Sequence, residues 1–164
     1  MTAASARGRR NRRAGHDTER LIVRWLKAVG YPDATTTRNT GGAGGHQHGD
    51  IIGPPLVAIE AKNVARPAWP TWISQAKREA DLAGPGCAWM VVRRTPGHPD
   101  PARWATVSDP AIWDDTEPMV PITTPGKWEP ARWLECTPGP IVVRGDLAAI
   151  AVVSTFADAI EACR

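Results

Sequence analysis

The sequence has few cysteines and no long hydrophobic run, and both absences exclude classes of protein. Its 164 residues include three cysteines, Cys87, Cys136 and Cys163, which are widely spaced and form no CxxC pair. Neither a disulfide framework nor a cysteine zinc site is expected, and a reducing, cytoplasmic setting fits best. No stretch could span a bilayer, and no apolar signal core follows the N-terminal arginines. We expect a single domain, because a chain of this length can bury a hydrophobic core without disulfides or a structural metal.

Positive charge is concentrated at the front of the chain. The net charge is only +3, but residues 1–50 hold nine Lys/Arg against four Asp/Glu, whereas the remainder holds eleven against thirteen. Five arginines fall within seven residues: Arg7, Arg9, Arg10, Arg12 and Arg13. Such a segment cannot bury itself and suits a flexible basic arm, residues 1–14, on an anionic partner, with nucleic acid as the candidate. The alternatives are a solvated terminus and a targeting leader.

Apolar spacing and turn residues predict a mixed α/β domain over residues 15–164. They predict a helix at 17–29, which could continue back into the arm, strands at 35–38, 50–52 and 56–62, a helix at 71–83 and a strand at 87–94. The order is αβββαβ. Weaker signals predict strands at 104–107 and 141–144, and a closing strand and helix over 149–164. Prolines crowd between residues 96 and 140, which favours loops and short strands there.

The stretch GHQHGDIIGPPLVAIEAK, residues 45–62, places charged side chains within apolar strands. Its Gly-Pro-Pro turn predicts that the strand after the turn folds back antiparallel on the strand before it. Asp50 then lies across the ladder from Ala58 and Glu60, and alternation puts Glu60 and Lys62 on one face. We therefore expect two carboxylates and a lysine to converge.

Convergent carboxylates suit a divalent cation. Two carboxylates held close together repel unless a cation lies between them, and hard oxygen ligands favour Mg²⁺ or Mn²⁺. Such an ion lowers the pKa of a bound water and neutralises charge that develops on phosphorus, and the Lys62 ammonium adds to this stabilisation. The pattern predicts phosphodiester hydrolysis. The alternative is a salt bridge on the exposed face of a strand.

Glu19 lies beside the apolar stripe of the first helix. An unpaired charge at that position would be costly, so we expect a partner for its carboxylate. The alternative is that the side chain lies at the edge of the stripe and reaches water, Arg20 or Arg24.

The stretch GDIIGPPLVAIEAK resembles the core of the PD-(D/E)XK nuclease superfamily. The wider run of GHDTERLIVRWLKAVGY, Arg38, the glycine-rich loop, GDII, VAIEAK and ISQ resembles the archaeal-type Holliday junction resolvases. The resemblance covers residues 15–94, which would be the catalytic core. It implies a restriction-endonuclease-like fold, with a central mixed β-sheet flanked by helices.

The resemblance also implies roles for individual residues. Glu19, Asp50 and Glu60 would bind one or two Mg²⁺ ions, for which Mn²⁺ would substitute, and the Ala61 carbonyl would complete the metal shell. Lys62 would position the attacking water and stabilise the transition state. Auxiliary roles near the scissile strand fall to two further residues, Arg38 and Gln75.

The loop NTGGAGGHQHG departs from the family pattern. Gly49 replaces the motif's proline, which we expect to affect only backbone rigidity, and the family's loop serine has no counterpart beyond the hydroxyl of Thr40. His46 and His48 precede an aspartate, as in the opening of a zinc hydrolase site, but the remaining histidines show no ligand spacing. Contact with DNA phosphate, assistance to the attacking water and no catalytic part at all stay open for these two histidines.

The expected function is Mg²⁺-dependent, structure-selective cleavage of branched DNA. Four-way junctions would be the substrate and a homodimer the acting species, because resolution needs two symmetric cuts. The alternatives are another PD-(D/E)XK nuclease of repair or restriction type, and a DNA-binding module that keeps the fold without the chemistry. The expected DNA contacts are Arg9, Arg10, Arg12, Arg13, Arg38, Thr40, His46 and His48.

Two features outside the motif complete the expectations. Trp69 and Trp72 flank Pro70 and are expected in the core rather than as base-stacking platforms. The proline- and tryptophan-rich extension at 95–164 has no counterpart in the resemblance, and its residues 95–140 are where we expect the substrate to be selected.

Overall fold

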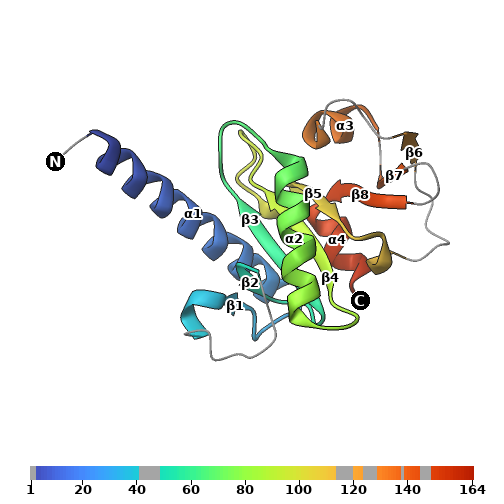
Figure 1. The fold of residues 1–164 in the computed structure, drawn as a ribbon, viewed down its shortest axis with the longest axis horizontal. Helices are drawn as coiled ribbons and strands as arrows, with labels where there is room; N and C mark the ends of the chain where they lie inside the picture. The colour runs from blue at the N-terminus through green and yellow to red at the C-terminus, as the bar shows by residue number, and fades with distance from the viewer. Residues whose placement is uncertain (1–2, 41–48, 114–119, 124–128, 138, 145–148) are drawn as a thin grey trace.

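The computed structural model describes residues 3–40, 49–113, 120–123, 129–137, 139–144 and 149–164. Within these residues the chain is an α/β protein in which four α-helices flank one mixed sheet of eight strands (Figure 1). The expected mixed sheet with flanking helices is therefore confirmed. In the same part of the chain, no helix combines the length and the apolarity that a membrane span requires.

The first half of the chain builds the part of the sheet that carries the candidate site. Its elements are α1 (Ala3–Ala28), β1 (Thr35–Thr36), the 3₁₀ helix η1 (Thr37–Thr40), β2 (Ile51–Ile52), β3 (Val57–Lys62), α2 (Trp69–Ala83) and β4 (Ala88–Arg93). Strands β1, β2 and β3 are antiparallel, and β4 runs parallel to β3 after the α2 crossover. This is the order αβββαβ that the sequence predicts. The strand expected at 35–38 is shorter, because Thr37 and Arg38 turn into η1.

The second half extends the sheet from β4. Its elements are η2 (Pro101–Arg103), β5 (Ala105–Ser108), η3 (Pro110–Ile112), β6 (Val120–Thr123), α3 (Pro130–Cys136), β7 (Ile141–Arg144), β8 (Ala149–Thr155) and α4 (Phe156–Ala162). The strand order is β1-β2-β3-β4-β5-β8-β7-β6, so β8 lies between β5 and β7. Short strands occupy the proline-rich region, as expected, whereas its short helix α3 was not predicted.

Apolar side chains on the two faces of the sheet form two separate cores. Ile59 of β3 packs with Ile22 and Leu26 of α1 and with residues of α4 on one face. Ala58 of β3 packs with Trp69, Trp72, Ile73 and other residues of α2 on the opposite face. Because side chains alternate along a strand, Glu60 and Lys62 share the α2 face with Ala58.

The arginine-rich segment is helical, so the first helix continues back into the arm, as the sequence allows. Helix α1 begins at Ala3, so residues 3–14 continue the helix backwards and project beyond the sheet (Figure 1). Alanine and arginine are both strong helix formers, so the composition that suggested disorder equally favours a helix. Helix α2 begins at Trp69 rather than at Thr71, because Pro70 falls in the first turn, where a missing N–H costs nothing.

Candidate active site

Asp50 lies directly before β2, opposite Glu60 of β3. Ile51 is the register partner of Ile59, so Asp50, which precedes Ile51, lies near Glu60, which follows Ile59. The Asp50 N–H donates to the Ile59 carbonyl at 2.8 Å, and the Ala61 N–H donates to Asp50 Oδ2 at 3.0 Å. The hairpin therefore brings these two carboxylates to neighbouring positions, as the turn predicts.

Glu60, Lys62 and Gln75 form a closed set of contacts between β3 and α2. Lys62 Nζ lies 2.5 Å from Glu60 Oε2 and donates to Gln75 Oε1 at 3.3 Å, while Gln75 Nε2 donates to Glu60 Oε2 at 3.3 Å. Glu60 is only 3 % exposed. The lysine, expected to act on a phosphate, is thus held in place by a buried carboxylate and by a side chain from the covering helix.

Glu19 has a partner, and that partner comes from η1 rather than from α1. Arg38 Nη2 lies 3.0 Å from Glu19 Oε1, and Arg38 Nη1 contacts His16 Nε2. Glu19 is 5 % exposed, whereas the Arg38 side chain remains 55 % exposed. The alternative partners Arg20 and Arg24 make no ion pair with Glu19 in the described residues, and Arg20 lies 4.0 Å from Asp17 instead.

Burial and the nearby charge of Asp50 raise the pKa of two glutamates of the site. Burial raises the pKa of Glu19, and the negative charge of Asp50 raises it further, against the opposing effects of Arg38 and His16. Burial likewise raises the pKa of Glu60, followed by the charge of Asp50, against the opposing effect of Lys62. Asp50 is therefore near enough to both glutamates for the three carboxylates to act as one electrostatic cluster.

Such a cluster has the donor chemistry that Mg²⁺ prefers. Among the described residues, no three Asp, Glu, His or Cys side chains lie close enough together to enclose a metal ion. However, Mg²⁺ is commonly held by only one or two carboxylates together with waters and substrate oxygens. Asp50 and Glu60 supply this minimum. The pKa values of Glu19 and Glu60 are raised by burial and by the charge of Asp50, so a cation at this site would stabilise the charged carboxylates.

The Ala61 carbonyl faces the same side of β3 as Asp50. The Ile59 carbonyl accepts from Asp50 on the β2 side, and the Lys62 carbonyl accepts from Arg94 on the β4 side. Carbonyls two residues apart point the same way along a strand, so that of Ala61 also faces β2. Its direction agrees with the role that the resemblance implies.

Two residues that the sequence pattern did not single out also lie at this edge. Asn63 Nδ2 donates to the Ala14 carbonyl at 3.1 Å and to Thr18 Oγ1 at 2.9 Å, which joins the end of β3 to α1. Arg93, the register partner of Lys62, is 8 % exposed and donates from Nη2 to a loop carbonyl at 3.3 Å. Its Nε has no hydrogen-bond partner in the described residues, and burial lowers its pKa. In the sequence, the signal that could have pointed to Arg93 is the charged end of the apolar run AWMVVRR.

The expected DNA contacts divide into three groups. Arg9, Arg12 and Arg13 are exposed on α1, and Arg38 is exposed beside Glu19. Arg10 and Thr40 lie within α1 and η1 respectively. His46 and His48 lie outside the described residues.

Trp69 and Trp72 belong to the core. Both are buried, at 2 % and 8 % exposure, and their rings meet edge to face with centroids 5.3 Å apart. The expectation of a core role for this pair is confirmed, because neither ring presents a free face to a nucleic acid base.

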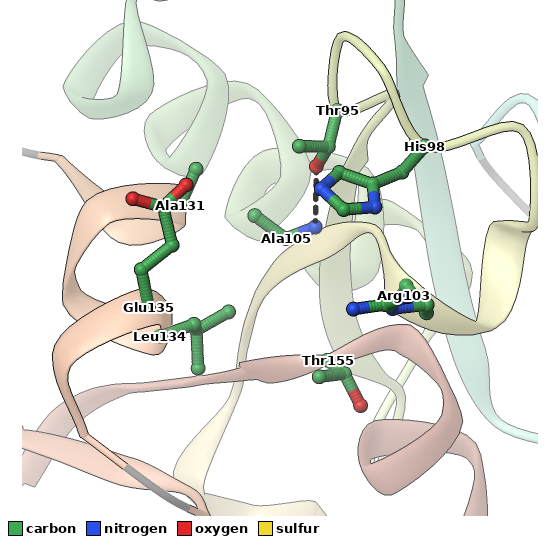
Figure 2. Close-up of a pocket in the computed structure, with 8 residues that line it drawn as sticks. All are labelled: Thr95, His98, Arg103, Ala105, Ala131, Leu134, Glu135 and Thr155. Atoms are coloured by element: carbon green, nitrogen blue, oxygen red, sulfur yellow. Dashed lines mark hydrogen bonds between the residues drawn. The ribbon is translucent and has the colours of Figure 1, made fainter.

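A separate cavity lies at the same edge of the sheet, two strands beyond β3. It measures about 180 Å³ and is lined by Thr95, His98, Arg103, Ala105, Ala131, Leu134, Glu135 and Thr155. Figure 2 shows the His98 ring and the Arg103 side chain entering from the segment after β4, opposite Leu134 and Glu135 of α3. The registers Lys62 with Arg93 and Arg93 with Ala105 place this cavity on the Lys62 side of the molecule. None of its lining residues is a candidate carboxylate of the site.

Comparison with protein-family models, with curated proteins and with solved structures finds no match. The class of protein that the fold and the site define is therefore a mixed α/β protein with a buried carboxylate and lysine cluster at one sheet edge.

Proposed function

We propose that this protein is a Mg²⁺-dependent DNA endonuclease of the PD-(D/E)XK type, with a restriction-endonuclease-like core. One observation carries the proposal: Asp50 and Glu60 lie opposite each other across a hairpin, and Lys62 is held at the same edge by Glu60 and Gln75. Burial, and after it the charge of Asp50, raises the pKa of Glu19 and of Glu60, and carboxyl groups perturbed in this way cluster at functional sites.

The residues have distinct parts in the proposed reaction. Asp50, Glu60 and the Ala61 carbonyl would hold Mg²⁺, with Glu19 next to them, and the ion supplies charge neutralisation and an activated water. The water oxygen forms a bond to phosphorus while the bond to the leaving oxygen breaks. Lys62 holds its ammonium beside the attacked phosphate, where it stabilises the added negative charge.

The proposed substrate is branched DNA, and in particular the four-way junction. This part of the proposal rests on the resemblance to archaeal-type resolvases and carries with it a homodimer, since two symmetric strands must be cut. Three free cysteines support a reducing, intracellular location for the activity. Another PD-(D/E)XK nuclease of repair or restriction type would use the same catalytic residues on a different DNA.

A non-catalytic DNA-binding module is the second candidate. It is favoured by one observation, namely that Glu19 and Glu60 already have cationic partners in Arg38 and Lys62. In such a module the carboxylates would serve only to position the basic side chains. The two candidates differ in whether DNA is cut.

Cleavage assays separate the candidates. We expect purified protein with Mg²⁺ to cut a labelled four-way junction faster than a linear duplex of the same sequence, and EDTA to stop the reaction. Asp50→Asn and Glu60→Gln should each lower the rate by about a hundredfold or more, because each removes a charge that the transition state needs. Asp81→Asn, an equal change at an exposed position of α2, is the matched control.

The outcomes are distinct. No cleavage by the wild type, with DNA binding unchanged in the two variants, would refute the enzyme and favour the binding module. Equal rates on the junction and the duplex would refute the junction as substrate while leaving the nuclease in place. The resolvase proposal predicts a dimer in sedimentation at working concentration, and a monomer there would contradict it.

A further inference from the structure

Helix α1 carries a continuous row of positive charge along one side. At 3.6 residues per turn, five basic residues fall within about 60° of one another around the helix axis. We call this row the basic stripe: Arg9, Arg13, Arg20, Arg24 and Lys27. All five are exposed. Arginines expected as an arm are thus part of a longer pattern that reaches the C-terminal end of the helix.

The side of α1 away from the basic stripe is packed on the sheet. Thr18, Ile22 and Leu26 are completely buried. Asn63 of the segment after β3 binds the Ala14 carbonyl and the Thr18 hydroxyl, which fixes the helix from about its middle onward. Arg20, Arg24 and Lys27 are therefore presented by a helix whose orientation relative to the candidate active site is set by the core.

The dimensions of the stripe match a short length of duplex. Arg9 and Lys27 are separated by about 27 Å of helix at 1.5 Å per residue. Successive base pairs of DNA rise 3.4 Å, so the stripe runs beside about eight base pairs. Glu19 lies on the flank of the same helix, between Arg13 and Arg24 in the chain. Along the helix axis, the stripe extends on both sides of Glu19, which lies about 100° around the axis from the middle of the stripe.

The chemistry of the stripe selects among anionic partners. A membrane-binding amphipathic helix needs a free apolar face, and that face of α1 is used for the core. Of the two acidic residues of α1, Asp17 lies nearer to the stripe, and its exposed 4.0 Å pair with Arg20 contributes little. Among the described residues, Arg24 and Lys27 have no ion pair that would neutralise them. Exposed cations along one side of a helix suit a phosphate backbone.

We propose that α1 lies along double-stranded nucleic acid and that the basic stripe binds phosphates on both sides of the position that faces Glu19. The inference deepens the proposed nuclease function, on which its link to Glu19 rests, and it assigns Arg20, Arg24 and Lys27 to binding. It also defines the substrate as continuous duplex flanking the scissile phosphate rather than a free end.

The test compares two variants of equal charge in metal-free buffer. Arg24→Gln with Lys27→Gln removes two positive charges from the stripe, and Arg78→Gln with Arg132→Gln removes two exposed charges from α2 and α3. Glutamine is a good helix former, so folding should persist, and thermal unfolding checks this. Binding of a fluorescent 20-base-pair duplex is followed by anisotropy from low to high salt.

We expect the stripe variant to bind more weakly and the slope of log K against log salt to fall by about two, with the control variant unchanged. Arg9→Gln with Arg13→Gln should show the same loss independently. Equal slopes in stripe and control variants would overturn the inference. So would stripe-dependent binding to phosphatidylserine vesicles without stripe-dependent binding to the duplex.

The nuclease proposal can fail separately. If the duplex binds in a stripe-dependent way but is never cut, the nuclease proposal is refuted and the proposal that the basic stripe binds duplex still holds. If the stripe variant and the control variant cut DNA equally well, the proposal for the basic stripe is overturned and the nuclease proposal still holds. For an active wild type, moving the cut site to within two base pairs of a duplex end should reduce cleavage, and unreduced cleavage there would also overturn the inference.

Discussion

At the scale of single residues, the candidate site is defined by which group restrains which. Lys62 lies between Glu60 and Gln75, so its ammonium has one position rather than the many that a free lysine samples. Glu19 is restrained by Arg38, whose side chain is 55 % exposed. In each pair a buried glutamate binds a cationic side chain. That cation, Arg38 or Lys62, could instead bind a phosphate.

Gln75 is a positioning residue, and Gln75→Leu tests this role. The substitution removes both hydrogen bonds of the amide while keeping the volume, so Lys62 loses one of its two restraints. We expect cleavage to fall about tenfold or more through kcat, because small misplacements of a catalytic group are costly. Metal-free DNA binding should be unchanged.

The neighbouring Ser74→Ala is the control, since the Ser74 hydroxyl contacts only the Pro70 carbonyl of its own helix. Gln75→Glu should recover part of the rate by keeping an acceptor for Lys62. A loss of binding in Gln75→Leu as large as the loss of kcat would contradict a positioning role.

Glu19→Gln tests the electrostatics of the cluster. A carboxyl group whose pKa is raised on folding stabilises the protein below its unfolded pKa, and that stabilisation is lost as the pH rises through the folded pKa. Metal-free wild type should therefore lose stability as the pH rises above the ordinary range for glutamate. The neutral variant avoids this loss and should be more stable at pH 8, by about 1 kcal/mol or about 2–4 °C.

The measurement is thermal unfolding in EDTA at pH 4 and pH 8. The advantage of Glu19→Gln should nearly vanish at pH 4, where the wild-type carboxyl is also neutral. Glu161→Gln, at an exposed position of α4, is the control. A variant that is less stable than the wild type at pH 8 would show that the Arg38 ion pair outweighs the cost of burial.

At the scale of elements, the β2–β3 hairpin is the unit that assembles the site. Its entry residue, Gly49, has φ of +111°, and a Cβ there would lie 2.9 Å from the Ile59 carbonyl oxygen. The prediction that this glycine affects only backbone rigidity is wrong, because its positive φ and its contact with Ile59 both require glycine. The glycine allows the backbone before Asp50 to approach β3 closely enough for Asp50 to meet Glu60.

Gly49→Ala should disturb the hairpin and destabilise the protein by about 2–3 kcal/mol, because positive φ and a backbone clash both oppose the methyl group. Gly30→Ala is a close control, since Gly30 has φ of +113° with open space around a Cβ. The difference between the two variants isolates the contact with Ile59. Chemical denaturation measures both, and equal losses would show that the clash relaxes at no cost.

Particular elements show how much the sequence could predict. The hairpin and α2 follow from local signals, namely a Gly-Pro-Pro turn with alternating residues and an apolar stripe ended by Gly84. The sequence left the start of α1 open, because the arginine-rich segment suits both an arm and a continued helix, and it did not show that β1 ends at Thr36. The pairing of Arg38 with Glu19 depends on where η1 folds over α1, which no local spacing encodes.

At the scale of the whole molecule, the charge of the first helix and the carboxylates of the sheet edge are parts of one arrangement. Asn63 joins the end of β3 to α1, so the core holds Arg20, Arg24 and Lys27 of the basic stripe in a set orientation to the Lys62 edge. The proline-rich region adds β5 to β8 to the sheet and encloses the cavity beside Arg103 and Glu135. Its lining residues come from segments that the resemblance does not cover.

The sequence by itself determined the β2–β3 hairpin that brings Asp50 near Glu60, helix α2 and the alternating faces of β3, because these depend on side-chain period and on a turn between adjacent strands. The tertiary structure alone decided the partner of Glu19, the contacts of Gln75 with Lys62 and Glu60, and the place of β8 between β5 and β7. Each of these depends on contacts between distant segments, whose geometry is set by packing of the whole core rather than by local propensity.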